Sequence, residues 1–187
     1  MSKILIAGAG GAPSEGVIYS LLKNPSNDVI GMGAEPTDLI LSAARKKYYV
    51  PYANQPEYKD HLLRILSAEK PDLVHFQNDL EIYHASLLRD EILDVGVKIF
   101  MPEHEVIDTC VHKYKSYRAF VEAGIKVPRN IMINDSRDLE QAFSELADAD
   151  GKIWLRSSSI GGGGKGALPT KDFAFARAAD RSPRGLG

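Results

Sequence analysis

The chain has 187 residues, 44% hydrophobic and 26% charged, with a formal net charge of −2. This composition is that of a folded globular protein and excludes a disordered chain. The near-neutral charge gives no sign of a nucleic-acid partner. No apolar run approaches the ~18 residues of a membrane-spanning helix, and no signal peptide is visible. With a single cysteine, Cys110, no internal disulfide is possible, so we expect a cytoplasmic protein with no membrane partner.

The first 105 residues alternate short apolar runs with amphipathic segments, which is typical of a parallel sheet covered by helices. Strands are predicted at 3–8, 29–34, 72–76 and 97–101, with a short extended piece at 48–51. Helices are predicted from a cap at Ser14 to residue 23, and at 39–46, 57–68 and 80–93. The sequence therefore predicts an α/β domain with a doubly wound parallel sheet over residues 1–105.

Gly8, Gly10 and Gly11 lie between the first strand and the first helix, where a dinucleotide-binding fingerprint would lie. The last fingerprint position holds Pro13 instead of the glycine that close helix–strand packing requires. An NAD-binding oxidoreductase is therefore disfavoured, and the glycines are interpreted as a tight turn. The turn still lies at the carboxyl edge of the sheet, so Gly10 and Gly11 are candidates for substrate contacts.

Asp79 and Glu81 follow the third predicted strand and reach the same edge of the sheet, so they are further candidates for substrate contacts. The alternative stays open, since acidic residues also suit the positive end of a helix. The five histidines have no ligand-like spacing, and no metal site is predicted. No catalytic residue can be assigned.

The pattern changes after residue 105, and residues 106–187 are predicted to contain three helices and three strands. Helices are predicted at 112–123, at 136–146 with Ser136 as its cap, and at 171–179. Strands are predicted near 130–133 and at 152–156 and 167–170. The last residues, 181–187, are interpreted as an irregular tail.

A loop rich in serine and glycine, Ser157–Gly166, follows the strand that ends at Arg156. Successive glycines expose backbone N–H groups that can surround phosphate oxygens, and the cations Arg156 and Lys165 can balance phosphate charge. The spacing is not that of a P-loop. A flexible linker is the alternative, but two cations and two flanking strands favour phosphate binding. The candidate loop residues are Ser157, Ser158, Ser159, Gly161, Gly162, Gly163, Gly164 and Lys165.

The run Val106–Pro128, with Lys113 near the start of a helix and a Gly-Ile-Lys-Val-Pro turn at its end, resembles the beginning of an ATP-grasp domain. The similarity is to the carbamoyl-phosphate-synthase large-subunit branch and to related carboxylate–amine ligases. The elements of residues 136–166 follow in the family's order. Tyr49-Val-Pro-Tyr-Ala and Lys70-Pro-Asp-Leu-Val are similar to the pre-ATP-grasp domain. The resemblance implies a pre-ATP-grasp domain at 1–105 and an incomplete first α+β subdomain of the ATP-grasp fold at 106–187.

The resemblance also implies that Lys113 and Arg156 touch the phosphates of ATP and that Ser157–Lys165 close over them. The implied activity is ATP-dependent ligation of a small carboxylate through an acyl-phosphate. The Mg²⁺ ligands would lie in a further subdomain, so we interpret the sequence as a truncated, frameshifted or split product that is inactive alone. The alternative is a non-catalytic subunit of a split ATP-grasp enzyme, which binds a separately encoded C-terminal chain. An incomplete domain would also expose apolar surface, which favours a homo-oligomer.

Overall fold

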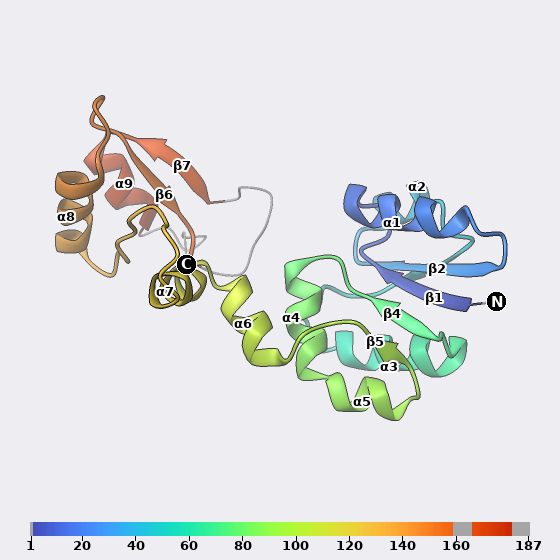
Figure 1. Ribbon diagram of the computed structural model, residues 1–187. Helices are drawn as coiled ribbons and strands as arrows, with labels where there is room; N and C mark the ends of the chain where they lie inside the picture. Colours follow the sequence, from blue (N-terminus) through green and yellow to red (C-terminus); the bar gives the residue numbers. More distant parts are fainter. Residues whose placement is uncertain (1, 159–165, 181–187) are drawn as a thin grey trace. The chain divides into compact units, whose positions relative to one another are not determined.

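The computed structural model of the protein describes residues 2–158 and 166–180. The chain divides into two compact units, Met1–Ile107 and Asp108–Gly187, and each is described by itself (Figure 1).

The first unit alternates strands and helices along its whole length. Its strands are β1 (Ser2–Ala7), β2 (Asn27–Gly33), β3 (Lys46–Tyr49), β4 (Leu73–His75) and β5 (Lys98–Ile99). Its helices are α1 (Ala12–Leu22), α2 (Pro36–Leu41), α3 (Tyr58–Glu69), α4 (Asp79–Leu87) and α5 (Arg89–Asp94), and α6 (His104–Val111) follows at the boundary with the second unit.

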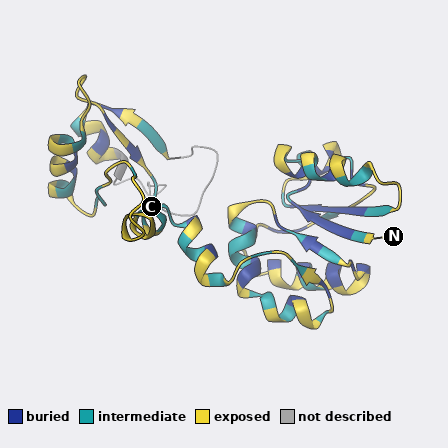
Figure 2. Ribbon diagram, viewed as in Figure 1, coloured by how far each residue is buried: buried dark blue, intermediate teal, exposed yellow. Residues whose placement is uncertain are grey.

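The five strands form one parallel sheet in the order β3-β2-β1-β4-β5. Alternate residues of β1 enter two different clusters, as the period of a strand requires. Leu5 and Ala7 pack with α3, α4 and α5, whereas Ile4 and Ile6 pack with α1 and α2. Helices therefore cover both faces (Figures 1 and 2), which confirms the predicted doubly wound sheet.

Three details of the first unit differ from the prediction. Gly11, not Ser14, is the cap of α1, because the Ser14 hydroxyl is buried and donates to the Ala7 carbonyl at 2.9 Å. The helix predicted at 39–46 is α2, which ends where Ser42 turns extended, and β3 follows it. The helix predicted at 80–93 breaks at Leu88 (φ −104°, ψ 17°) into α4 and α5.

The second unit is built on a two-stranded antiparallel hairpin of β6 (Ile153–Arg156) and β7 (Ala167–Thr170). Its helices are α7 (Lys113–Glu122), α8 (Ser136–Leu146) and α9 (Phe173–Asp180). The core is a small cluster between the hairpin, α8 and α9, made of Leu139, Ala142, Ile153, Leu155 and Ala176.

Two predictions for the second unit are wrong. Asp135, not Ser136, caps α8, because its carboxylate accepts from the backbone N–H groups of Arg137 and Asp138 in a capping box. Residues 130–133 are irregular and not a strand, although Ile131 and Ile133 still pack against the core.

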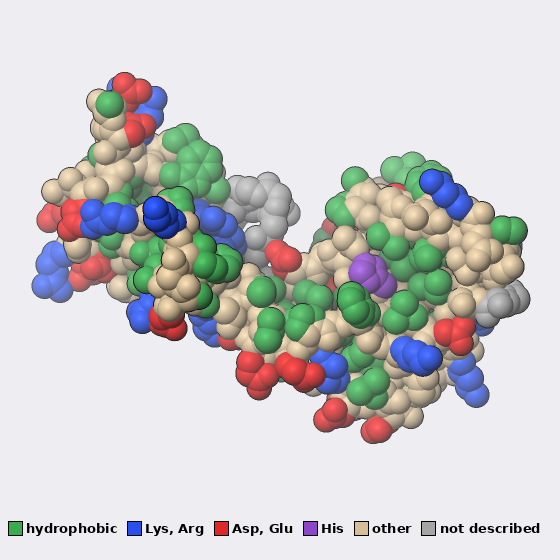
Figure 3. Space-filling model, viewed as in Figure 1, with side chains coloured by type: hydrophobic (Ala, Val, Ile, Leu, Met, Phe, Trp, Pro, Cys, Tyr) green, Lys and Arg blue, Asp and Glu red, His purple; other side chains and the backbone are tan. Residues whose placement is uncertain are grey.

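The described helices include none long and apolar enough to cross a membrane. On the face shown in Figure 3, Lys and Arg side chains are interspersed with Asp and Glu.

Candidate functional site

A cavity of about 810 Å³ opens in the second unit between α7, the irregular segment 127–133 and β6. Its volume lies within the range of small-molecule sites. Its walls combine aromatic side chains with three cationic ones. The aromatic members are Tyr114, Tyr117, Phe120 and Trp154, and the cationic members are Lys113, Arg129 and Arg156.

Strand β6 brings Arg156 to this cavity. Ile153 and Leu155 are buried in the core, so Trp154 and Arg156 lie on the opposite, exposed face of the strand. Within residues 2–158 and 166–180, no carboxylate lies at ion-pair distance from Arg156. Arg156 is exposed and lines the cavity, and its guanidinium has the planar fork of donors that suits phosphate.

The β6–β7 hairpin fixes both ends of the Ser/Gly-rich loop. The backbone N–H of Ser157 donates to the Gly166 carbonyl at 3.0 Å, and Gly166 has a φ of +68°, which glycine adopts without strain. Ser157 and Ser158 line the cavity. Six candidate residues lie outside the described part of the chain: Ser159, Gly161, Gly162, Gly163, Gly164 and Lys165.

Helix α7 brings Lys113 to the same cavity as its first residue. Lys113 and Arg156 are distant in the sequence and come from different elements, yet both line one cavity. The first turn of α7 contains no acidic residue. An anionic ligand near its positive end would therefore be favoured.

In the glycine turn of the first unit, the carboxylate of Glu15 occupies the backbone N–H of Gly10. One oxygen of the Glu15 carboxylate accepts from the Gly10 N–H at 2.9 Å, and the other accepts from the Ala43 N–H at 2.9 Å. Burial raises the pKa of Glu15, but hydrogen bonds from Ala43, Ser42 and Gly10 together lower it by more than burial raises it. The pKa of Glu15 therefore lies below its usual value. A negative carboxylate at the N–H that a pyrophosphate would use argues against the dinucleotide interpretation.

The two acidic candidates at the sheet edge have different environments. Asp79 is exposed at the start of α4, whereas Glu81 is only 6% exposed. The Glu81 carboxyl group accepts from Asn78 Nδ2 at 2.6 Å and from the Tyr58 hydroxyl at 3.3 Å. Burial raises the pKa of Glu81 to about 7, although the Asn78 and Tyr58 hydrogen bonds lower it. Glu81 is therefore buried in the core below the carboxyl edge of the sheet and is not exposed at that edge.

Trp154 is a cavity residue that the sequence analysis missed. The alternation of buried Ile153 and Leu155 places Trp154 on the face of Arg156. Ile153 and Leu155 line the cavity as well, so the alternation alone does not identify the cavity residues.

No protein-family model matches the chain. The β subunit of the ADP-forming succinate–CoA ligase from Hydrogenovibrio crunogenus is 36% identical over 56 residues, which are 30% of this chain and 14% of that protein. The biotin carboxylase domain of 2-oxoglutarate carboxylase from Hydrogenobacter thermophilus, solved with MgADP, ADP and bicarbonate, is similar with a TM-score of 0.66 at 16% identity. The L-amino acid ligase from Bacillus licheniformis is similar with a TM-score of 0.66 at 12% identity.

These structural similarities extend over 96% and 97% of the chain and so include both units. The fold is that of the N-terminal part of an ATP-grasp enzyme. The chain spans only 40% and 42% of the two ATP-grasp structures. Within residues 2–158 and 166–180, no three or more His, Cys, Asp or Glu side chains come together in a group that could hold a metal ion.

Proposed function

We propose that the second unit holds the phosphates of ATP in an ATP-dependent carboxylate–amine ligase. The observation that carries this proposal is the presence of Lys113 and Arg156 in one cavity, beside the hairpin end from which the Ser/Gly-rich loop departs. Two cations of different geometry can balance the charge of a di- or triphosphate, Arg156 by a bidentate fork and Lys113 as a point charge.

In this proposal the loop supplies hydrogen-bond donors. Ser157 and Ser158 lie at the cavity, and we assign the same role from the sequence to Ser159, Gly161–Gly164 and Lys165. The aromatic wall that includes Trp154 and Tyr117 offers the base a stacking surface.

We assign residues 1–105 to a pre-ATP-grasp domain and residues 106–187 to the first part of the ATP-grasp module. Of the substrate candidates in the first unit, we retain Asp79 as a contact for substrate. Glu81 is buried, Gly10 already donates its N–H to Glu15, and the Gly11 N–H donates to the Gly8 carbonyl at 3.1 Å.

The complete reaction would be that of a carboxylate–amine ligase. The carboxylate attacks the γ-phosphorus of ATP and ADP leaves, and an amine then displaces inorganic phosphate from the acyl-phosphate. The coverage of about two fifths of the ATP-grasp structures supports the view that the 187 residues bind nucleotide without turnover. Steady ADP release from ATP and Mg²⁺ by the purified chain would contradict that view.

A split enzyme is the second candidate, because the similar succinate–CoA ligase chain is itself named a subunit. In that case the chain is one subunit and a separately encoded chain carries the Mg²⁺ ligands. A stable complex between the chain and such a partner, with ligase activity that neither shows alone, would support it.

The phosphate site is tested by nucleotide affinity. We expect Lys113→Ala and Arg156→Ala each to weaken ADP binding by roughly 10-fold, the loss for one charged contact to phosphate. Arg118→Ala is the matched control, because Arg118 lies on α7, pairs with Glu122 and is not among the residues that line the cavity. Isothermal titration calorimetry measures all four proteins. Equal ADP affinity in all of them would overturn the assignment.

A further inference from the structure

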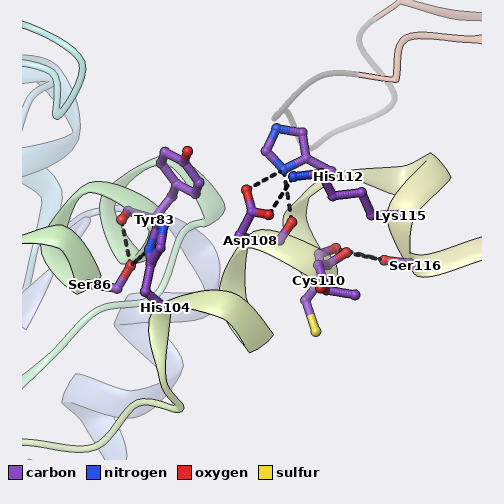
Figure 4. A network of polar contacts seen from close by, with 9 residues as sticks. Tyr83, Ser86, His104, Asp108, Cys110, His112, Lys115 and Ser116 are labelled. Atoms are coloured by element: carbon purple, nitrogen blue, oxygen red, sulfur yellow. Dashed lines mark hydrogen bonds and ion pairs between the residues drawn. The ribbon is translucent and has the colours of Figure 1, made fainter. Parts of the chain in front are cut away.

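The end of α6 and the start of α7 form an elbow held by side chains on either side of Lys113 (Figure 4). The His112 Nδ1–H donates to the Asp108 carbonyl at 2.8 Å and lies 3.1 Å from Asp108 Oδ1. The Lys115 ammonium pairs with Asp108 Oδ2. The Ser116 hydroxyl lies 2.7 Å from the Thr109 carbonyl oxygen, to which it donates.

Asp108 is the central group of this elbow. Its carboxylate contacts residue 112 with one oxygen and residue 115 with the other, so it bridges the first turn of α7 across Lys113. The first turn of α7 has no acidic residue of its own, and lysines there are disfavoured by the helix dipole. The Asp108 carboxylate supplies the compensating negative charge from the preceding helix.

We propose that Asp108 is a positioning residue that fixes the start of α7 and thereby directs Lys113 into the cavity. This inference rests on the proposed function, because it assigns Asp108 to the site through Lys113. Asp108 is not among the residues that line the cavity, whereas Lys113 and Ser116 are.

Electrostatic attraction and positioning predict opposite effects of neutralising Asp108 on nucleotide affinity. Neutralising Asp108 makes the surroundings of an anionic ligand more positive and leaves Lys115 without this carboxylate, so attraction alone would tighten nucleotide binding. Positioning predicts weaker binding, since a misdirected Lys113 loses its contact. The sign of the change therefore separates the two effects.

The experiment measures ADP affinity by the fluorescence of Trp154, the only tryptophan in the chain and a residue of the cavity wall. We expect Asp108→Asn to weaken ADP binding roughly 3- to 10-fold, and less than about 1.5-fold in a Lys113→Ala background, because coupled residues are not additive. Asp150→Asn is the matched control, since among the described residues the Asp150 carboxylate pairs only with Lys152, which is not part of the elbow. Unchanged or tighter binding, or an equal loss in both backgrounds, would overturn the proposal.

A second measurement does not depend on nucleotide. We expect amide hydrogens of residues 112–116 to exchange faster in Asp108→Asn, and also in Ser116→Ala, which loosens the elbow without changing charge. The Asp150→Asn control should exchange like the wild type. Unchanged exchange in both elbow variants contradicts the positioning role. Normal ADP affinity in Lys113→Ala contradicts the proposed function instead, so the two failures are distinguishable.

Discussion

Glu81 is a buried carboxyl group at the start of α4 whose ionisation is linked to folding. Its pKa rises from an ordinary 4.5 to about 7 in the folded protein. The folded state therefore holds the proton more tightly than the unfolded state, and the free energy of unfolding falls as pH rises from about 4.5 to about 7.

We expect Glu81→Gln, which has no charge at any pH, to lose this dependence. Relative to the wild type, its free energy of unfolding should be higher at pH 8 than at pH 4.5. Urea unfolding at the two pH values measures the difference, with Glu57→Gln, at an exposed position, as the control. An equal difference at both pH values would show that the Glu81 pKa does not rise on folding.

At the scale of elements, the turn between β1 and α1 requires a glycine at position 10, whereas helix α1 does not require the glycine at position 16. Gly10 has a φ of +92°, and a Cβ there would lie 1.9 Å from the Asp38 carbonyl oxygen in α2. Gly16 lies inside α1, and a Cβ there meets nothing within 4 Å.

We therefore expect opposite effects from the same substitution. Gly10→Ala should lower the free energy of unfolding by more than about 1 kcal/mol through strain and the displacement of α2. Gly16→Ala should raise it by about 0.5–1 kcal/mol through helix propensity. Thermal unfolding of both variants measures this. A stabilised Gly10→Ala variant would rule out the close approach of α2 to the turn.

Most helices and strands were predictable from the sequence, because the spacing of apolar residues along a segment depends only on that segment. The strand predicted at 152–156 is β6, and the alternation of buried Ile153 and Leu155 fixes the face on which Arg156 lies. The break at Leu88 was not predictable, because the apolar pattern continues through it. The Ser136 prediction was wrong for a local reason, since Asp135 is an equally good cap one residue earlier.

At the scale of the whole molecule, the two units have separate cores and should lose structure separately. Leu155→Ala removes a large side chain from the small core of the second unit and should destabilise that unit by about 2–4 kcal/mol. Trp154 fluorescence reports the second unit, and hydrogen exchange of β1 and β2 reports the first.

We expect Leu155→Ala to lower the fluorescence midpoint and to leave the exchange of β1 and β2 unchanged. Leu5→Ala, in the core of the first unit, should do the reverse. A loss of protection in both units from either substitution would show that they unfold as one.

The candidate site was predictable in part. The Gly-rich loop, Arg156 and Lys113 stand out as residues, but their presence in one cavity depends on contacts between elements far apart in the chain. The elbow at Asp108 gave no signal, because no helix was predicted at 104–111 and its role arises only where α6 meets α7.

The central claim is that the second unit binds a nucleotide by its phosphates through Lys113 and Arg156. The most direct test is calorimetric titration of AMP, ADP and ATP into the wild type and into a Lys113→Ala, Arg156→Ala double variant. We predict that wild-type affinity rises from AMP to ADP to ATP and that the rise disappears in the double variant. Equal affinity of the wild type for all three nucleotides, or an unchanged rise in the double variant, would contradict the account.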